Sequence, residues 1–178
     1  TPLYSSAASD VYKRQGTGVL FAAAMAGACS PEALDTVLQQ MASSQHRLLD
    51  QLEPHRQAIH ACTDVTGFGL LGHLGEMVQS SSPLRITLQT DNIPAYPDAM
   101  DRLAQGYASS LAPANRKSWH WLDGAIQLDE APSQALLELL VDPQTCGPLL
   151  LACPETTAHS LMVEGPWIPI GNATADHG

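Results

Sequence analysis

The chain has 178 residues and a formal net charge of −10, with 44% hydrophobic and 15% charged residues. This composition is that of a globular protein and excludes a disordered tail, and the length favours a single domain. No cluster of lysine and arginine occurs, which argues against a nucleic-acid surface, because phosphate neutralisation requires concentrated basic side chains. An anionic substrate would need metal ions or helix ends as its counter-charge.

Residues 1–15, TPLYSSAASDVYKRQ, show no clear hydrophobic period and do not resemble the rest of the sequence. We interpret them as a non-native or disordered leader and assign the predicted domain to residues 16–178. Two basic residues and the apolar run at 19–28 precede Cys29, as in a secretion signal. The run is short, lies far from the first residue and could not span a bilayer. We therefore expect a cytoplasmic protein with no membrane segment.

The four cysteines, Cys29, Cys62, Cys146 and Cys153, are widely spaced and include no CxxC pair. Zinc ligands usually arrive in close pairs, so this spacing does not favour a zinc site. We expect reduced thiols.

The first part of the domain is expected to be helical. Residues 16–27 begin with two glycines and are predicted as a helix. Ser30, Pro31 and Glu32 then supply a hydroxyl cap, a proline at the first helical position and an acid in the first turn. This second helix has an apolar face and a possible break at 43–44.

A strand, a helix and a second strand come next. A short strand is predicted over 60–63, ending at Asp64, and apolar residues at helical spacing continue over 70–78 until the break at 80–83. Apolar and polar residues alternate over 84–88, which predicts a half-buried strand.

The central region is less regular. A helix over 98–105 is stopped by Gly106, and a long polar connection over 107–118 leads to Trp119 and Trp121. These two tryptophans are spaced as on one face of a strand, and core or interdomain packing is their plainest explanation.

The last part alternates again, with a helix over 135–141, an apolar strand over 149–153, a short helix from Glu155 and a strand near 167–170. Some connections are too short for parallel crossovers. The pattern therefore favours an α+β fold of layered helices and mixed sheet over a doubly wound sheet.

The segment HACTDVTGFGLLGHLGEM places Asp64 among glycines where a strand becomes a helix. As an N-cap, its carboxylate would accept hydrogen bonds from amides one turn later, worth about 1 kcal/mol. As a hard oxygen ligand, it could hold Mg²⁺, which takes one or two protein carboxylates together with water and phosphate oxygens. Gly67 and Gly69 would let backbone amides approach an anion, whereas the stripe of glycines from Gly69 to Gly75 would equally serve helix packing. From these residues alone the cap is the commoner role.

The string ACTDVTGFGLLGHLGEM resembles the signature of selenophosphate synthetase, also called selenide, water dikinase. Three further stretches agree with this family in order and spacing: the Gly-Thr-Gly-Val-Leu at 16–20, the loop over 106–115, and DPQTCGPLLL from Asp142. The resemblance covers essentially all of residues 16–171.

The family makes selenophosphate, AMP and phosphate from ATP, selenide and water, and its members are two-domain homodimers related to aminoimidazole ribonucleotide synthetase. The resemblance implies that this chain is the C-terminal domain, an α/β/α layered unit, without the N-terminal ATP-binding domain. It implies that Asp64 contributes a carboxylate to the magnesium ions around the ATP phosphates, which makes the metal ligand the favoured interpretation. Gly67, Gly69 and Asn115 are expected near the phosphates, and no catalytic residue is expected here. Because one aspartate cannot hold a metal cluster, the chain alone is expected to be inactive.

Three positions depart from the family pattern. Residues 13–15, Lys-Arg-Gln, stand where a lysine and a proline are expected, Cys146 replaces serine, and Pro148 replaces glycine. Proline has no amide donor, so its loop cannot keep every backbone contact of the glycine version. We expect Cys146 to be a buried, serine-sized substitute, with a reactive thiol as the alternative.

Other polar residues have two interpretations each. Asp142 could orient a metal-bound water or simply form a turn before proline. Asn115 could stabilise its loop or reach the active-site cleft. His60 and His73 flank the Asp64 turn, where a satisfied or exposed histidine is the commoner outcome.

Two alternative functions stay open. The chain could belong to a related ATP-using protein of the aminoimidazole ribonucleotide synthetase or hydrogenase-maturation type. It could also be a catalytically silent interaction domain, in which the Asp64 turn is only a capped helix.

Overall fold

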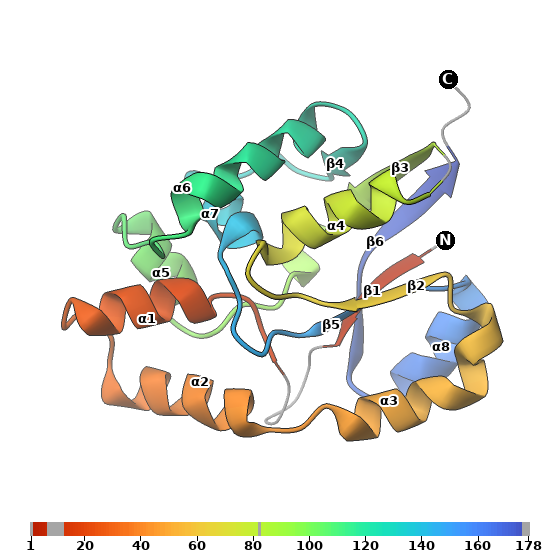
Figure 1. Cartoon of the computed structure of the whole chain (residues 1–178), viewed down its shortest axis with the longest axis horizontal. Coiled ribbons are helices and arrows are strands. Elements are labelled where there is room, and N and C mark those ends of the chain that lie inside the picture. The colour runs from red at the N-terminus through yellow and green to blue at the C-terminus, as the bar shows by residue number, and fades with distance from the viewer. Residues whose placement is uncertain (1, 7–12, 82, 176–178) are drawn as a thin grey trace.

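The computed structural model describes residues 2–6, 13–81 and 83–175. Its centre is a six-stranded sheet with the order β2-β5-β1-β6-β3-β4 (Figure 1). The strands are Pro2–Ser6 (β1), Ala61–Asp64 (β2), Leu84–Leu88 (β3), Ile126–Leu128 (β4), Leu149–Ala152 (β5) and Trp167–Ala175 (β6). Only β3 and β4 run parallel among these pairs, and the other neighbours are antiparallel, which confirms the predicted mixed sheet.

Helices make up most of the remaining described chain. The α-helices are Thr17–Met25 (α1), Pro31–Ala42 (α2), His46–Leu52 (α3), Gly69–Gln79 (α4), Ala99–Ala104 (α5), Ala112–Asn115 (α6), Gln134–Val141 (α7) and Glu155–Glu164 (α8). The 3₁₀ helices are Glu53–Ala58 (η1), Thr90–Asn92 (η2) and Arg116–Asp123 (η3). The predicted cap of α2 is confirmed, because the Ser30 hydroxyl oxygen accepts a hydrogen bond from the Ala33 amide at 3.1 Å.

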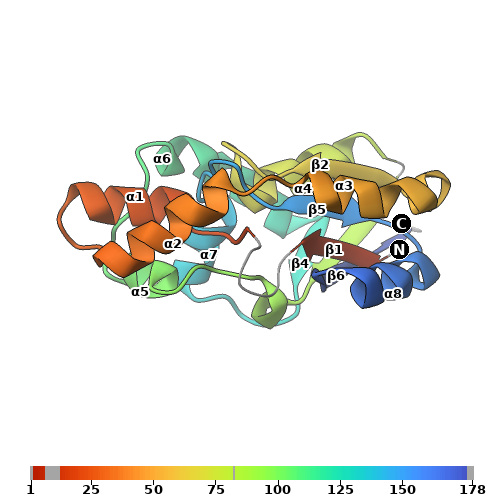
Figure 2. The same cartoon turned by 90° about the horizontal axis from the view of Figure 1, so that it is seen from below.

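Helices cover both faces of the sheet, which confirms the layered α/β/α arrangement (Figures 1 and 2). Leu150 of β5 belongs to a buried cluster that includes Leu70 of α4. Leu151, the next residue, belongs to a second cluster with Leu48 of α3 and Leu161 of α8. Because successive side chains of a strand point to opposite faces, α4 lies on one face and α3 and α8 on the other.

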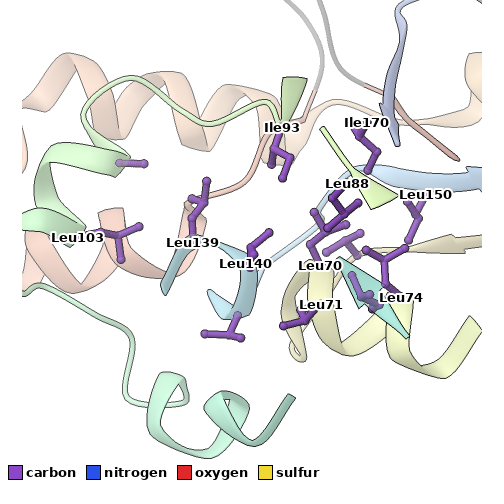
Figure 3. Packing of buried hydrophobic residues seen from close by; sticks show 14 of the residues in the cluster. Leu70, Leu71, Leu74, Leu88, Ile93, Leu103, Leu139, Leu140, Leu150 and Ile170 are labelled. Carbon is purple, nitrogen blue, oxygen red and sulfur yellow. The ribbon is translucent and has the colours of Figure 1, made fainter. Parts of the chain in front are cut away.

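The larger cluster anchors the helices whose ends form the candidate site. Figure 3 labels ten of its side chains, which come from α4, α5, α7, the sheet and the residue after η2: Leu70, Leu71, Leu74, Leu88, Ile93, Leu103, Leu139, Leu140, Leu150 and Ile170. Full burial of a leucine side chain contributes about 1.5–3 kcal/mol. The N-terminus of α4 and the C-terminus of α7 are therefore held firmly beside each other.

Strand β1 lies in the segment that the sequence analysis set apart from the predicted domain. It lies between β5 and β6 and pairs antiparallel with both, so residues 2–6 belong to the fold, and Gln15 is buried as well. Residues 7–12 lie outside the described part of the chain. Strand pairing satisfies backbone groups and needs no side-chain period, so the hydrophobic pattern of residues 1–15 does not indicate it. The non-native origin of residues 1–15 stays a prediction.

The region between α5 and α7 also differs from expectation. The polar connection contains α6, and the two tryptophans lie in η3 rather than in a strand. Their predicted packing role is confirmed: Trp119 Nε1 donates to the Leu137 carbonyl at 3.1 Å, and Trp121 packs on α4 at Gly75. The short strand β4 has no counterpart among the predicted elements.

Within the described residues, no helix combines the length and apolar character that a membrane crossing requires.

Candidate functional site

Asp64 is the last residue of β2, an edge strand of the sheet, and its Cα partner in β5 is Leu149. The side chain is exposed, and its carboxylate makes no hydrogen bond or ion pair with the described residues. Helix α4 begins five residues later, its N-cap is Phe68, and no side chain caps it. The interpretation of Asp64 as a helix cap is therefore wrong. Its carboxylate is available to a ligand.

The turn between Asp64 and α4 is pinned by backbone contacts to the segment that precedes β5. The Val65 amide donates to the Pro148 carbonyl at 2.8 Å, and the Gln144 amide donates to the Thr66 carbonyl at 3.0 Å. Pro148 thus contributes its carbonyl oxygen, which the substitution of glycine by proline leaves intact. Asp64 is followed at once by two anchored residues.

His73 of α4 holds the same turn from the helix side. The Thr66 amide donates to His73 Nε2 at 3.1 Å, and the Thr66 hydroxyl oxygen lies 3.2 Å from the same nitrogen. Because an amide N–H can only donate, Nε2 accepts, and in the neutral ring the proton is on Nδ1. Nδ1 faces Glu76 Oε2 at 3.2 Å, without hydrogen-bond alignment. His73 is therefore hydrogen-bonded through Nε2 alone, and His60 has the exposed position that the sequence analysis gave as the other common outcome.

Asn115 holds the turn from a third direction. It is buried, and its side-chain amide donates to the Gly67 carbonyl at 2.8 Å and to the Val141 carbonyl at 3.0 Å. Both amide hydrogens are thus engaged inside the protein. This geometry favours the loop-stabilising alternative over a side chain that reaches into a cleft.

The glycines of the turn and of α4 serve different purposes. Gly69 has φ +70, and a Cβ there would lie 2.7 Å from the Val141 carbonyl carbon, so only glycine fits between α4 and α7. A Cβ at Gly72 would meet the Phe68 Cβ at 2.7 Å, and one at Gly75 would collide with the Trp121 indole. The packing interpretation of the stripe is confirmed. Gly67 differs, because a Cβ there would meet nothing within 4 Å.

The DPQT segment, whose backbone holds the Asp64 turn, uses its side chains to cap helix α1. Gln144 Oε1 accepts hydrogen bonds from the Gly16 and Thr17 amides, both at 3.0 Å. Asp142 Oδ2 accepts from the Gly18 amide at 3.0 Å and from Gln144 Nε2 at 3.1 Å. These acceptors occupy the first amides of α1, which leaves that helix end without free donors for an anion.

Asp142 is a buried carboxyl group, with 1% of its surface exposed. Burial raises its pKa to about 7, against the lowering effect of the hydrogen bonds from α1 and Gln144. Its second oxygen, Oδ1, has no hydrogen-bond partner among the described residues. Of the two interpretations of Asp142, these contacts favour a structural role over the orientation of a metal-bound water. The role is to cap helix α1, whereas the sequence analysis expected a turn before proline. Sequence reasoning missed the role of Gln144, whose only signal was its place in DPQT.

The cysteines are free thiols throughout. Cys146 is exposed and adopts a left-handed backbone conformation with φ +52, so the prediction of a buried substitute is wrong. At its neighbour Gly147, a Cβ would collide with the Val65 carbonyl oxygen, so only glycine fits there. Cys62 is also exposed, whereas Cys153 is buried.

The residues fit one part of a magnesium site. Mg²⁺ in phosphate sites takes one or two carboxylates and completes its shell with water and phosphate oxygens, and the exposed Asp64 carboxylate can supply one such ligand. Within the described ranges, no group of three or more His, Cys, Asp or Glu side chains could hold a metal ion by itself. Further ligands would have to come from a nucleotide, water or another polypeptide segment.

Comparison with known proteins finds relatives over most of the chain. A family model described as "AIR synthase related protein, C-terminal domain" matches residues 15–178. The selenide, water dikinase of Desulfitobacterium hafniense (strain DSM 10664 / DCB-2) is 32% identical over 154 residues, which cover 84% of this chain and 42% of that protein. The protein of the same name from Pelobacter propionicus is 33% identical over 150 residues, covering 84% and 41%. The chain thus spans less than half the length of these curated relatives.

Solved structures show the same fold at lower identity. The hydrogenase maturation protein HypE in complex with ATP aligns with a TM-score of 0.59 and 18% identity, over 99% of this chain and 43% of that one. Thiamine-monophosphate kinase from Stenotrophomonas maltophilia K279a aligns with a TM-score of 0.58 and 13% identity, over 99% and 48%. Given the match of the family model to nearly the whole sequence, the chain belongs to the family of the C-terminal domain of AIR synthase related proteins.

Proposed function

We propose that this chain forms the C-terminal part of an ATP-dependent selenophosphate synthetase, which converts ATP, selenide and water to selenophosphate, AMP and phosphate. Asp64 contributes one carboxylate ligand to Mg²⁺ at the ATP phosphates. The observation that carries the proposal is an exposed carboxylate, held by an anchored turn, that has no partner among the described residues. The names of the curated relatives support the choice of reaction.

Within this proposal the other predicted site residues have separate roles. Gly67, beside which there is open space, faces the phosphates. Gly69 and Asn115 shape the turn through their contacts with Val141 and Gly67. Bound magnesium would neutralise phosphate charge during transfer, and the chain's own contribution is to hold the Asp64 carboxylate in place.

The remaining ligands and the nucleotide surface belong to an N-terminal domain, and the complete enzyme is a cytoplasmic homodimer. Under this proposal the chain alone is inactive, since one carboxylate cannot retain a metal cluster. The related ATP-using proteins of the aminoimidazole ribonucleotide synthetase or hydrogenase-maturation type are the alternative. The hypothesis of a catalytically silent interaction domain assumed that Asp64 only caps the helix, and Asp64 does not cap α4.

The test joins the chain, with strand β1 retained, to the N-terminal part of the Desulfitobacterium hafniense relative and measures selenophosphate by phosphorus NMR. We expect product from the chimera with Mg²⁺, ATP and selenide, and none from the chain alone. Asp64→Asn should lower kcat by at least about tenfold, as changes around metal sites usually do. Asp123→Asn alters an exposed carboxylate at the end of η3 and serves as the matched control.

Two results would refute the proposal. Equal rates for Asp64→Asn and the unmodified chimera would show that Asp64 is not a metal ligand. Selenophosphate formed by the chain alone would show that no second domain is needed. A chimera that folds and hydrolyses ATP without forming selenophosphate would favour the alternative family members.

A further inference from the structure

We infer that His73 is a positioning residue for Asp64, a role that rests on the proposed metal site. The Asp64 carboxylate has no hydrogen-bond partner among the described residues, so within the protein only the backbone, through the Cα–Cβ bond, limits where it can point. Upstream, that backbone is fixed by pairing of β2 with β5. Downstream, it is fixed by the contacts of Val65 and Thr66, and His73 provides the acceptor for the Thr66 amide.

The contact depends on which ring nitrogen carries the proton. Nε2 must be unprotonated to accept from the Thr66 amide at 3.1 Å, which assigns the proton to Nδ1. Glu76, one turn further along α4, places a carboxylate oxygen 3.2 Å from Nδ1 and so favours the Nδ1–H form. His73 is 7% exposed and comes from a helix anchored by Leu70, Leu71 and Leu74, which makes it a rigid support.

This arrangement explains why a histidine stands on α4 at a distance of seven residues from the turn it serves. Thr66 precedes α4, and helical carbonyls accept from amides further along the chain, so the backbone of α4 offers the Thr66 amide no acceptor. Without His73 the Thr66 amide would lose its acceptor, and the residues immediately after Asp64 would move more freely. The carboxylate would then be ordered only when metal binds, which costs affinity.

The experiment uses the full chain and begins without metal. Nitrogen NMR of labelled histidine should show one histidine whose Nε2 is unprotonated and hydrogen-bonded while Nδ1 carries the proton. In His73→Leu, the Thr66 amide should exchange with solvent about fivefold to tenfold faster, the factor expected for one lost hydrogen bond. In His73→Gln, the amide oxygen can replace Nε2 as acceptor, so exchange should return close to the original rate. His60→Leu changes an exposed histidine before β2 and is the matched control.

The second readout is Mn²⁺ binding to the chimera with the N-terminal domain in the presence of ATP, measured by line broadening at the residues around Asp64. We expect affinity to fall in His73→Leu by about the same fivefold to tenfold and to recover in His73→Gln. A protonated Nε2 in the unmodified chain, or Mn²⁺ affinity unaffected by His73→Leu, would overturn the inference. Absence of Asp64-dependent Mn²⁺ binding in the chimera with ATP would overturn the proposed metal site instead, while Thr66 exchange in the chain would still report whether His73 holds the turn.

Discussion

The buried carboxyl group of Asp142 makes the stability of this domain depend on pH in an unusual direction. Its pKa is about 7 in the folded chain, against 3.8 for an exposed aspartate. A raised pKa means that the folded state binds the proton more tightly, so the stabilisation is fully present below about pH 4 and is lost as the pH rises through 7. At 1.36 kcal/mol for each pH unit, this group should add about 2.5 kcal/mol to the unfolding free energy at pH 5 relative to pH 8.

Asp142→Asn removes the titration while keeping an oxygen that can accept from the Gly18 amide and from Gln144. If the new amide nitrogen finds no acceptor at the position of Oδ1, the variant should also lose about 1–3 kcal/mol of unfolding free energy. This loss does not depend on pH. In urea denaturation, the unfolding free energy of the parent should therefore rise from pH 8 to pH 5 by more than that of the variant. Asp123→Asn, an exposed control, should behave like the parent. If Asp142→Asn and the parent change equally with pH, the reasoning about this buried acid is wrong.

Three further outcomes can be measured on the same chain. Gly69→Ala should destabilise the fold by about 3 kcal/mol in chemical denaturation, because it combines a positive φ with a collision against Val141, whereas Gly67→Ala should change stability by less than about 0.5 kcal/mol. Asn115→Asp removes both donors and places oxygens against two carbonyls, so the melting temperature should fall by an amount equivalent to about 2–4 kcal/mol. Burial raises the pKa of Cys153 to about 11, so iodoacetamide at neutral pH should modify it only after unfolding, as mass spectrometry of its peptide would show.

The layered fold and the place of Asp64 were accessible from the sequence because both depend on local patterns. Helical periods, the Ser30 cap and the alternation at 84–88 are properties of neighbouring residues, and each corresponds to an observed element. The position of Asp64 at the end of a strand was likewise readable from the residues around it.

The features that the sequence did not show depend on contacts between distant segments. Nothing in the pattern around Asn115 indicates that its amide reaches Gly67 and Val141. The pairing of residues 2–6 within the sheet is a backbone contact, which the spacing of hydrophobic residues does not reveal. Short 3₁₀ segments such as η3 have no strong period of their own, which is why the spacing of the two tryptophans suggests a strand.

The cap on α1 has a consequence for the order in which the domain is assembled during synthesis. The acceptors for the amides of residues 16–18 are supplied by Asp142 and Gln144, more than 120 positions later in translation. A nascent chain therefore emerges from the ribosome with the start of this helix unsatisfied until the DPQT segment has been made. Closure of so long a loop is entropically costly and slow. Docking of α1 should accordingly be among the last steps on the way to the native domain.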